Sequence, residues 1–124
     1  MHLILALILF GHGFAHLPGF LVFWKLATLK EMPYRTTILA GHVNVGDQGI
    51  RVVGALWLVA ALAFVASSIS AGARLAWWQP VTLLSSVFSL LLCIIGWPDA
   101  RFGLLINVVL IAFLLVNRQT GWLP

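Results

Sequence analysis

Residues 97–107 read Trp-Pro-Asp-Ala-Arg-Phe-Gly-Leu-Leu-Ile-Asn and join two long apolar runs of the chain. Proline lacks the amide hydrogen that a continuing helix needs, so Pro98 indicates the end of one helix and the start of another. The segment also places an acid, a base and a carboxamide (Asp99, Arg101 and Asn107) among hydrocarbon side chains. We therefore expect these three residues to find polar partners or to lie at a membrane boundary.

The composition indicates that a lipid bilayer solvates most of this chain. Of its 124 residues, 62% are hydrophobic and 8% are charged, against about 25% charged in an average soluble domain. A soluble fold of this size has too much exterior to bury so much apolar surface. The sequence therefore predicts an integral membrane protein.

The apolar runs predict an all-α bundle of four transmembrane helices in one domain, residues 1–124. The helices are expected at about residues 3–24, 50–71, 77–97 and 99–117, and a long polar loop joins the first two. Residues 3–24 alone would extend about 33 Å as a helix, enough for one crossing. We expect this first helix to be retained rather than cleaved as a signal peptide, because no Lys or Arg precedes it and no small-residue cleavage site follows it.

The distribution of charge predicts the orientation. Four crossings place both termini on one side, and cytoplasmic loops carry an excess of Lys and Arg. Five basic residues lie on the side of the 25–49 loop, against two on the side of the termini. The sequence thus predicts a multi-pass protein of a bacterial inner (plasma) membrane, with the 25–49 loop cytoplasmic and both termini outside. The five are Lys25, Lys30, Arg35, Arg51 and Arg101, and the two are Arg74 and Arg118.

The tryptophans support this register. Tryptophan is enriched at both membrane–water interfaces, and five of the six fall at predicted boundaries, whereas Trp57 lies about two turns inside the second helix. The basic residues form no stripe of the kind that binds nucleic acid, so we expect the lipid bilayer, and no nucleic acid, as a partner.

Four charged residues near the helix starts are interpreted as structural. Asp47 and Asp99 are expected to cap the N-termini of the second and fourth helices, where a carboxylate can accept from free amide groups. Arg51 follows Asp47 at a spacing that allows an ion pair, or it anchors to lipid headgroups. Arg101 is expected to reach the headgroups, or to pair with Asp99 or Asp47.

His12 and His16 are the first candidates for binding chemistry. They are four residues apart and share a helix face, so they could bind a metal ion, haem or another tetrapyrrole, or serve proton or quinone chemistry. The alternative is that both histidines only join helices by hydrogen bonds. The single cysteine, Cys93, excludes an intramolecular disulfide and a multi-cysteine metal site.

Counting residues from the boundaries brings further polar side chains to the level of these histidines. His16, Ser89 and Asn107 each lie eight residues from a boundary residue, which is about 12 Å deep on a helix. We therefore expect a polar centre of His16, Ser89 and Asn107, with His12 one turn further out. These four residues are the candidate cofactor-binding set, with the cofactor unknown, and the alternative is that they only fix the helix register.

The sequence gives no support for a soluble-type catalytic site. Its only acids are Glu31, Asp47 and Asp99, and it has no phosphate-binding glycine loop, nucleophile elbow or zincin motif. No catalytic residue is expected.

Short motifs resemble one group of known proteins. The motifs are His12-Gly13, residues 51–58 (RVVGALWL), residues 96–103 (GWPDARFG) and Asn107. Together they resemble the small four-helix bacterial membrane proteins grouped around the DoxX-like families. The resemblance implies a four-helix inner-membrane bundle, and some DoxX relatives are quinone-linked redox subunits. It supplies no catalytic residue.

Three functional hypotheses follow. The first is a small subunit or oligomer within a larger membrane assembly, without catalysis of its own, whose small-residue faces on the second and third helices, including Ala60 and Ala61, contact partners. The second is a redox or cofactor-binding protein that uses His12 and His16 to bind haem, another tetrapyrrole, metal or quinone. The third is a dimeric transporter or channel.

Overall fold

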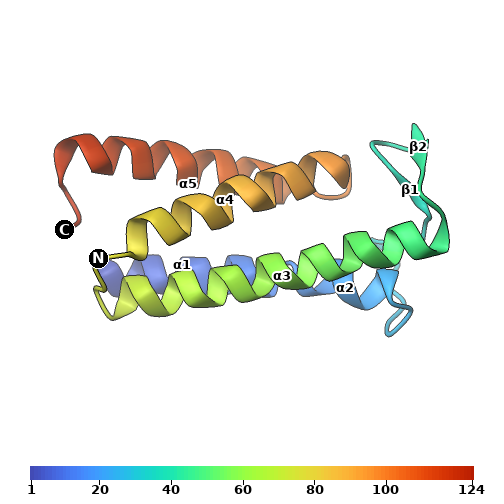
Figure 1. The fold of residues 1–124 in the computed structure, drawn as a ribbon, viewed down its shortest axis with the longest axis horizontal. Helices are drawn as coiled ribbons and strands as arrows, with labels where there is room; N and C mark the ends of the chain where they lie inside the picture. The colour runs from blue at the N-terminus through green and yellow to red at the C-terminus, as the bar shows by residue number, and fades with distance from the viewer.

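The computed structural model describes residues 1–124, and it is mostly helical (Figure 1). Four segments are long and apolar enough to cross a membrane, and the first consists of two helices, α1 and α2. The expected bundle of four spans is therefore confirmed at this level. The elements are α1 His2–Phe14, α2 Leu17–Phe23, β1 Thr37–Ile38, β2 Val43–Asn44, α3 Gly46–Gly72, α4 Trp78–Ile95 and α5 Arg101–Thr120.

The first span is broken, which the sequence analysis did not predict. Pro18 lies in the first turn of α2, and a proline ring conflicts with the carbonyl four residues earlier, here that of Phe14. The helix tightens before it: the amide of His16 donates to the carbonyl of Gly13 at 3.1 Å rather than to that of His12. The carbonyl of His12 is thereby left free for another donor.

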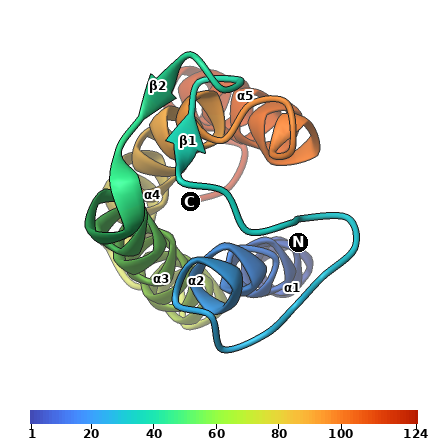
Figure 2. The ribbon, with the colours of Figure 1, turned by 90° about the vertical axis from the view of Figure 1, so that its right-hand side faces the viewer.

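The helices form an open array rather than a closed bundle. α1 and α2 pack on α3, α3 packs on α4, and α4 packs on α5. Seen from the end that carries the hairpin, the helices describe a C, with α1 and α5 at its two tips (Figure 2). Both chain termini lie at the other end of the bundle (Figure 1).

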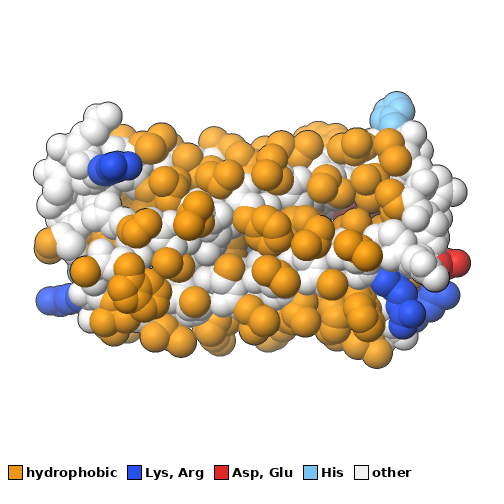
Figure 3. All heavy atoms as spheres, in the orientation of Figure 1, with side chains coloured by type: hydrophobic (Ala, Val, Ile, Leu, Met, Phe, Trp, Pro, Cys, Tyr) orange, Lys and Arg blue, Asp and Glu red, His pale blue; other side chains and the backbone are white.

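Apolar packing divides between the two ends. One buried cluster at the end of the termini includes Leu9, Phe64 and Leu114, and a second cluster toward the hairpin includes Ile50 and Leu92. Hydrophobic side chains also cover the visible middle of the surface, while Lys and Arg side chains lie toward its ends (Figure 3). This surface is the one expected of helices that face lipid.

The connection between α2 and α3 is not simply the long polar loop that we expected, because it contains a short hairpin. β1 pairs antiparallel with β2, and the tip of this hairpin docks on the end of α4. There the amide of Leu39 donates to the carbonyl of Ile95 at 2.8 Å, and the amide of Ala40 donates to the carbonyl of Trp97 at 3.1 Å. Two otherwise free carbonyls at a helix end are satisfied in this way, and the hairpin closes over the end of the bundle.

The expected capping by Asp47 is wrong. α3 begins at Gly46 with Val45 as its N-cap, and no side chain caps it. The carboxylate of Asp47 instead accepts from the hydroxyl of Tyr34 in the folded connection. This hydrogen bond beside a negative charge raises the pKa of Tyr34.

The expected capping by Asp99 is also wrong. α5 begins at Arg101, with Ala100 as its N-cap and no side-chain cap. The carboxylate of Asp99 instead pairs with the guanidinium of Arg35 at 3.4 Å. In both cases the folded 25–45 connection supplies a nearer partner than the helix N-terminus.

Neither Arg51 nor Arg101 forms an ion pair with Asp47 or Asp99. The guanidinium of Arg51 lies over the ring of Trp24, 4.9 Å from its centroid, and that of Arg101 lies over the ring of Phe102, at 5.1 Å. Guanidinium groups stack favourably on aromatic faces.

Ala60 and Ala61 do not form a partner surface. They are 0% and 4% exposed because other helices of the same chain cover them. The contact is closest at Gly13 of α1, where a Cβ would lie 2.8 Å from the Cβ of Phe64 and 3.1 Å from the carbonyl oxygen of Ala61. Close approach at small residues holds α1 to α3 within one molecule.

This contact predicts that Gly13→Ala destabilises the protein by about 1–3 kcal/mol, the range for overpacking in a filled core. Gly11→Ala is the matched control on the same helix, because nothing lies within 4 Å of a Cβ there. The measurement is the free energy of unfolding in mild detergent, and equal values for the two variants would contradict the close contact.

Candidate functional site

The structure brings together the four polar residues that the depth count placed at one level. His12, His16, Ser89 and Asn107 are 5%, 2%, 0% and 0% exposed. His12 Nε2 lies 3.0 Å from Asn107 Oδ1, Asn107 Nδ2 lies 2.7 Å from Ser89 Oγ, and Ser89 Oγ lies 2.5 Å from His16 Nε2. The predicted polar centre therefore exists, and its binding of a cofactor stays a prediction.

The directions of these hydrogen bonds follow from one carbonyl group. His16 Nδ1 lies 2.7 Å from the carbonyl oxygen of His12, which can only accept, so Nδ1 carries the hydrogen. In a neutral imidazole the other nitrogen is then an acceptor, and Ser89 must donate its hydroxyl hydrogen to His16 Nε2. We treat the imidazoles as neutral because unpaired charge in a membrane span is costly.

The remaining two bonds are fixed in turn. The oxygen of Ser89, having donated its hydrogen, accepts from the amide nitrogen of Asn107, and the amide oxygen of Asn107 accepts from Nε2–H of His12. The bonds thus form a closed ring that starts and ends at His12. It joins α1, α4 and α5, and it leaves Nδ1 of His12 as an acceptor.

A cavity of about 270 Å³ opens beside this ring. It lies between α1 and α2 on one side and α5 on the other, beneath the folded 25–45 connection. Its inner wall includes His12, His16 and Cys93. Arg35 and Asp99, which pair with each other, lie toward its mouth.

Trp57, which did not fit the aromatic belts, also lines this cavity. It is 6% exposed, and its ring lies 5.2 Å from that of His16 between centroids. Trp57 was not among the site residues expected from the sequence. The available signal was its position, since an indole so far from the interface needs a partner for its N–H.

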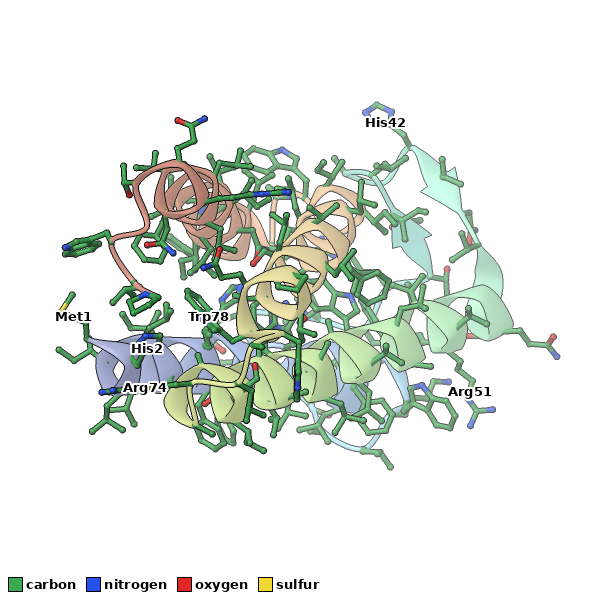
Figure 4. All side chains as sticks on the ribbon, turned by 60° about the vertical axis from the view of Figure 1, so that its left-hand side comes forward. Met1, His2, His42, Arg51, Arg74 and Trp78 are labelled. Carbon is green, nitrogen blue, oxygen red and sulfur yellow. The ribbon has the colours of Figure 1, made fainter.

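Two buried polar atoms on residues that line the cavity have no hydrogen-bond partner: Nδ1 of His12 and Nε1 of Trp57. The first is an acceptor and the second a donor, and an unpaired buried polar group costs about 1–3 kcal/mol. The two other unpartnered nitrogens both belong to His2, which lies beside Trp78 at the opposite end of the molecule (Figure 4). Two residues that line the cavity thus carry one unused acceptor and one unused donor, both of them buried.

The arrangement gives little room for metal or haem ligation by the histidine pair. Three of the four ring nitrogens of His12 and His16 are already hydrogen-bonded, so only Nδ1 of His12 remains free. No group of three or more His, Cys, Asp or Glu side chains is placed to hold a metal ion. The geometry is better suited to a ligand held by hydrogen bonds.

No protein-family model, curated protein or solved structure matches the chain. The resemblance to the DoxX-like families therefore stays a prediction.

The hydrogen-bonded ring predicts that Ser89→Ala destabilises the protein by about 1–3 kcal/mol, because both His16 and Asn107 lose a buried partner. Ser86→Ala is the control: Ser86 is equally buried one turn earlier on α4, but its hydroxyl bonds only to the carbonyl of Thr82 in its own helix. Its loss should be clearly smaller. Unfolding in detergent measures both, and a loss for Ser86→Ala as large as that for Ser89→Ala would count against the ring.

Proposed function

We propose that this protein binds a neutral, membrane-soluble molecule in the cavity beside the hydrogen-bonded ring, and that the ligand has a ring-sized head group with a hydroxyl, as in a phenol or a quinol. The observation that carries the proposal is a pair of buried, unpartnered atoms on two residues that line the cavity, the acceptor Nδ1 of His12 and the donor Nε1 of Trp57. A bound ligand would reach them after small side-chain movements. Hydroxyl groups both donate and accept hydrogen bonds.

The cavity favours a small and uncharged head group. Its volume of about 270 Å³ lies near the lower end of ligand pockets, which is about 300 Å³. The charged side chains toward its mouth, Arg35 and Asp99, already neutralise each other. Most of the lining is apolar, with few polar groups, which is typical of sites for small molecules.

The proposal corresponds to the cofactor-binding hypothesis in its quinone form. It uses His12 and Trp57 as ligand contacts and assigns His16, Ser89 and Asn107 to orienting His12. The assembly-subunit hypothesis and the transporter or channel hypothesis stay predictions, and a ligand-binding subunit of a larger assembly would combine the first two hypotheses.

Binding is tested by calorimetric titration of the detergent-extracted protein with decylhydroquinone under anaerobic conditions. Trp57→Phe removes the N–H donor and keeps an aromatic ring, so affinity should fall about tenfold, the equivalent of one hydrogen bond. Trp77→Phe is the control, since Trp77 is exposed at the other end of the molecule.

A second comparison tests the acceptor on His12. The dimethyl ether of decylhydroquinone cannot donate a hydrogen bond, and it should bind more weakly than the parent compound. Equal affinities for both compounds, together with an unaffected Trp57→Phe variant, would refute the proposed site.

We further propose that the protein lies in a bacterial inner membrane with its hairpin end in the cytoplasm. The support is the excess of basic residues on that side, five against two, together with the positive-inside rule.

Labelling with a membrane-impermeant maleimide tests this orientation in whole cells. His42→Cys at the hairpin and Gln119→Cys near the C-terminus both introduce an exposed thiol, whereas the native Cys93 is buried. Gln119→Cys should react in intact cells, and His42→Cys only after permeabilisation. The reverse pattern would invert the proposed topology.

A further inference from the structure

A second cavity lies between the same two helices, nearer the chain termini. Its volume is about 460 Å³, and all ten residues that line it are hydrophobic. From α1 they include Ile4, Leu5 and Ile8, and from α5 they include Ile106, Val109 and Leu110. We call this cavity the apolar groove.

The apolar groove continues from the polar cavity. Ile106 lines both. On α1, Ile4 and Ile8 are spaced by four residues and so lie on the same helix face as His12, four residues further on. The distance from Ile4 to His12 along the helix is about 12 Å. The two cavities therefore lie end to end along α1 and α5 and meet at Ile106, and we refer to the two together as the depression.

We infer that the apolar groove holds a hydrocarbon tail of the ligand whose head group occupies the polar cavity. The inference rests on the proposed function, and it narrows the ligand to a long-tailed amphiphile. A tail in the groove would cover Leu5 and Leu110, which are already 7% and 6% exposed, and would pack between the exposed walls Ile8 and Val109.

The lining of the groove favours a hydrocarbon tail over two other occupants, a phospholipid and a transmembrane helix of a partner protein. A phospholipid head group carries a phosphate, the groove itself supplies no charged or hydrogen-bonding side chain, and the one basic side chain of the polar cavity, Arg35, is already paired with Asp99. A transmembrane helix of a partner would span about 30 Å of hydrocarbon, whereas the apolar walls extend about 12 Å before the polar cavity begins. A single chain that ends in a polar head group matches both parts of the depression.

The test compares hydroquinone without a tail and decylhydroquinone in calorimetric titrations of the full chain. Ile8→Trp and Val109→Trp each narrow the groove from one wall, and both positions are half exposed, so the larger side chain does not disrupt a buried core. Leu62→Trp is the control, on an exposed face of α3 outside both cavities. Each compound partitions into detergent to the same extent for all variants, so this partition does not affect the ratio of affinities between variants.

We expect both groove variants to bind decylhydroquinone about tenfold more weakly, as when about two methylene groups leave the groove. Hydroquinone affinity should be unchanged in these variants, and Leu62→Trp should change neither affinity. Unchanged decylhydroquinone binding in both groove variants would overturn the inference and leave the proposed function standing, as would an effect only on co-purified phospholipid or on oligomeric state. Failure of both compounds to bind the native chain would overturn the proposed function and this inference together.

Discussion

The hydrogen bond from the imidazole of His16 to the carbonyl of His12 fixes which of the surrounding polar groups donate hydrogen bonds and which accept them. The carbonyl is free because Pro18 breaks the first span and the amide of His16 turns to Gly13 instead. An acceptor in hydrocarbon needs a donor, and the side chain of His16 supplies it at 2.7 Å. A local backbone defect thereby fixes which nitrogen of His16 carries the hydrogen.

The position of the hydrogen on His16 fixes the hydrogen-bond directions on three helices. Ser89 on α4 must donate to His16, Asn107 on α5 must therefore orient its amide group toward Ser89, and His12 must donate to the oxygen of Asn107. Because every polar atom of the ring other than Nδ1 of His12 has a partner within it, the neutral ring can lie in the membrane interior. The one atom that the ring leaves unused, Nδ1 of His12, is the atom that the proposed ligand would bind.

The openness of the array gives this centre its access. α1 and α5 do not pack on each other as the other neighbours do, and the two cavities lie between them. The folded 25–45 connection closes the hairpin end by bonding to the carbonyl of Ile95 at the end of α4 and to that of Trp97 just after it. In the proposed function, a lipid-soluble molecule would approach from the side, between α1 and α5.

The sequence by itself determined the four spans, the placement of both termini at one end of the bundle, and the common level of His16, Ser89 and Asn107, because hydropathy and helical rise are local properties that can be counted along the chain. Only the tertiary structure decided the partners. Asp47 and Asp99 do not cap helix N-termini as expected. They interact with Tyr34 and Arg35, because the 25–45 connection folds back over the bundle. Ala60 and Ala61 became interior for a similar reason, since α1 approaches α3 at Gly13. The cavity, the unpartnered indole of Trp57 and the opening between α1 and α5 likewise depend on how helices distant in sequence pack, and no residue spacing within one helix records that packing.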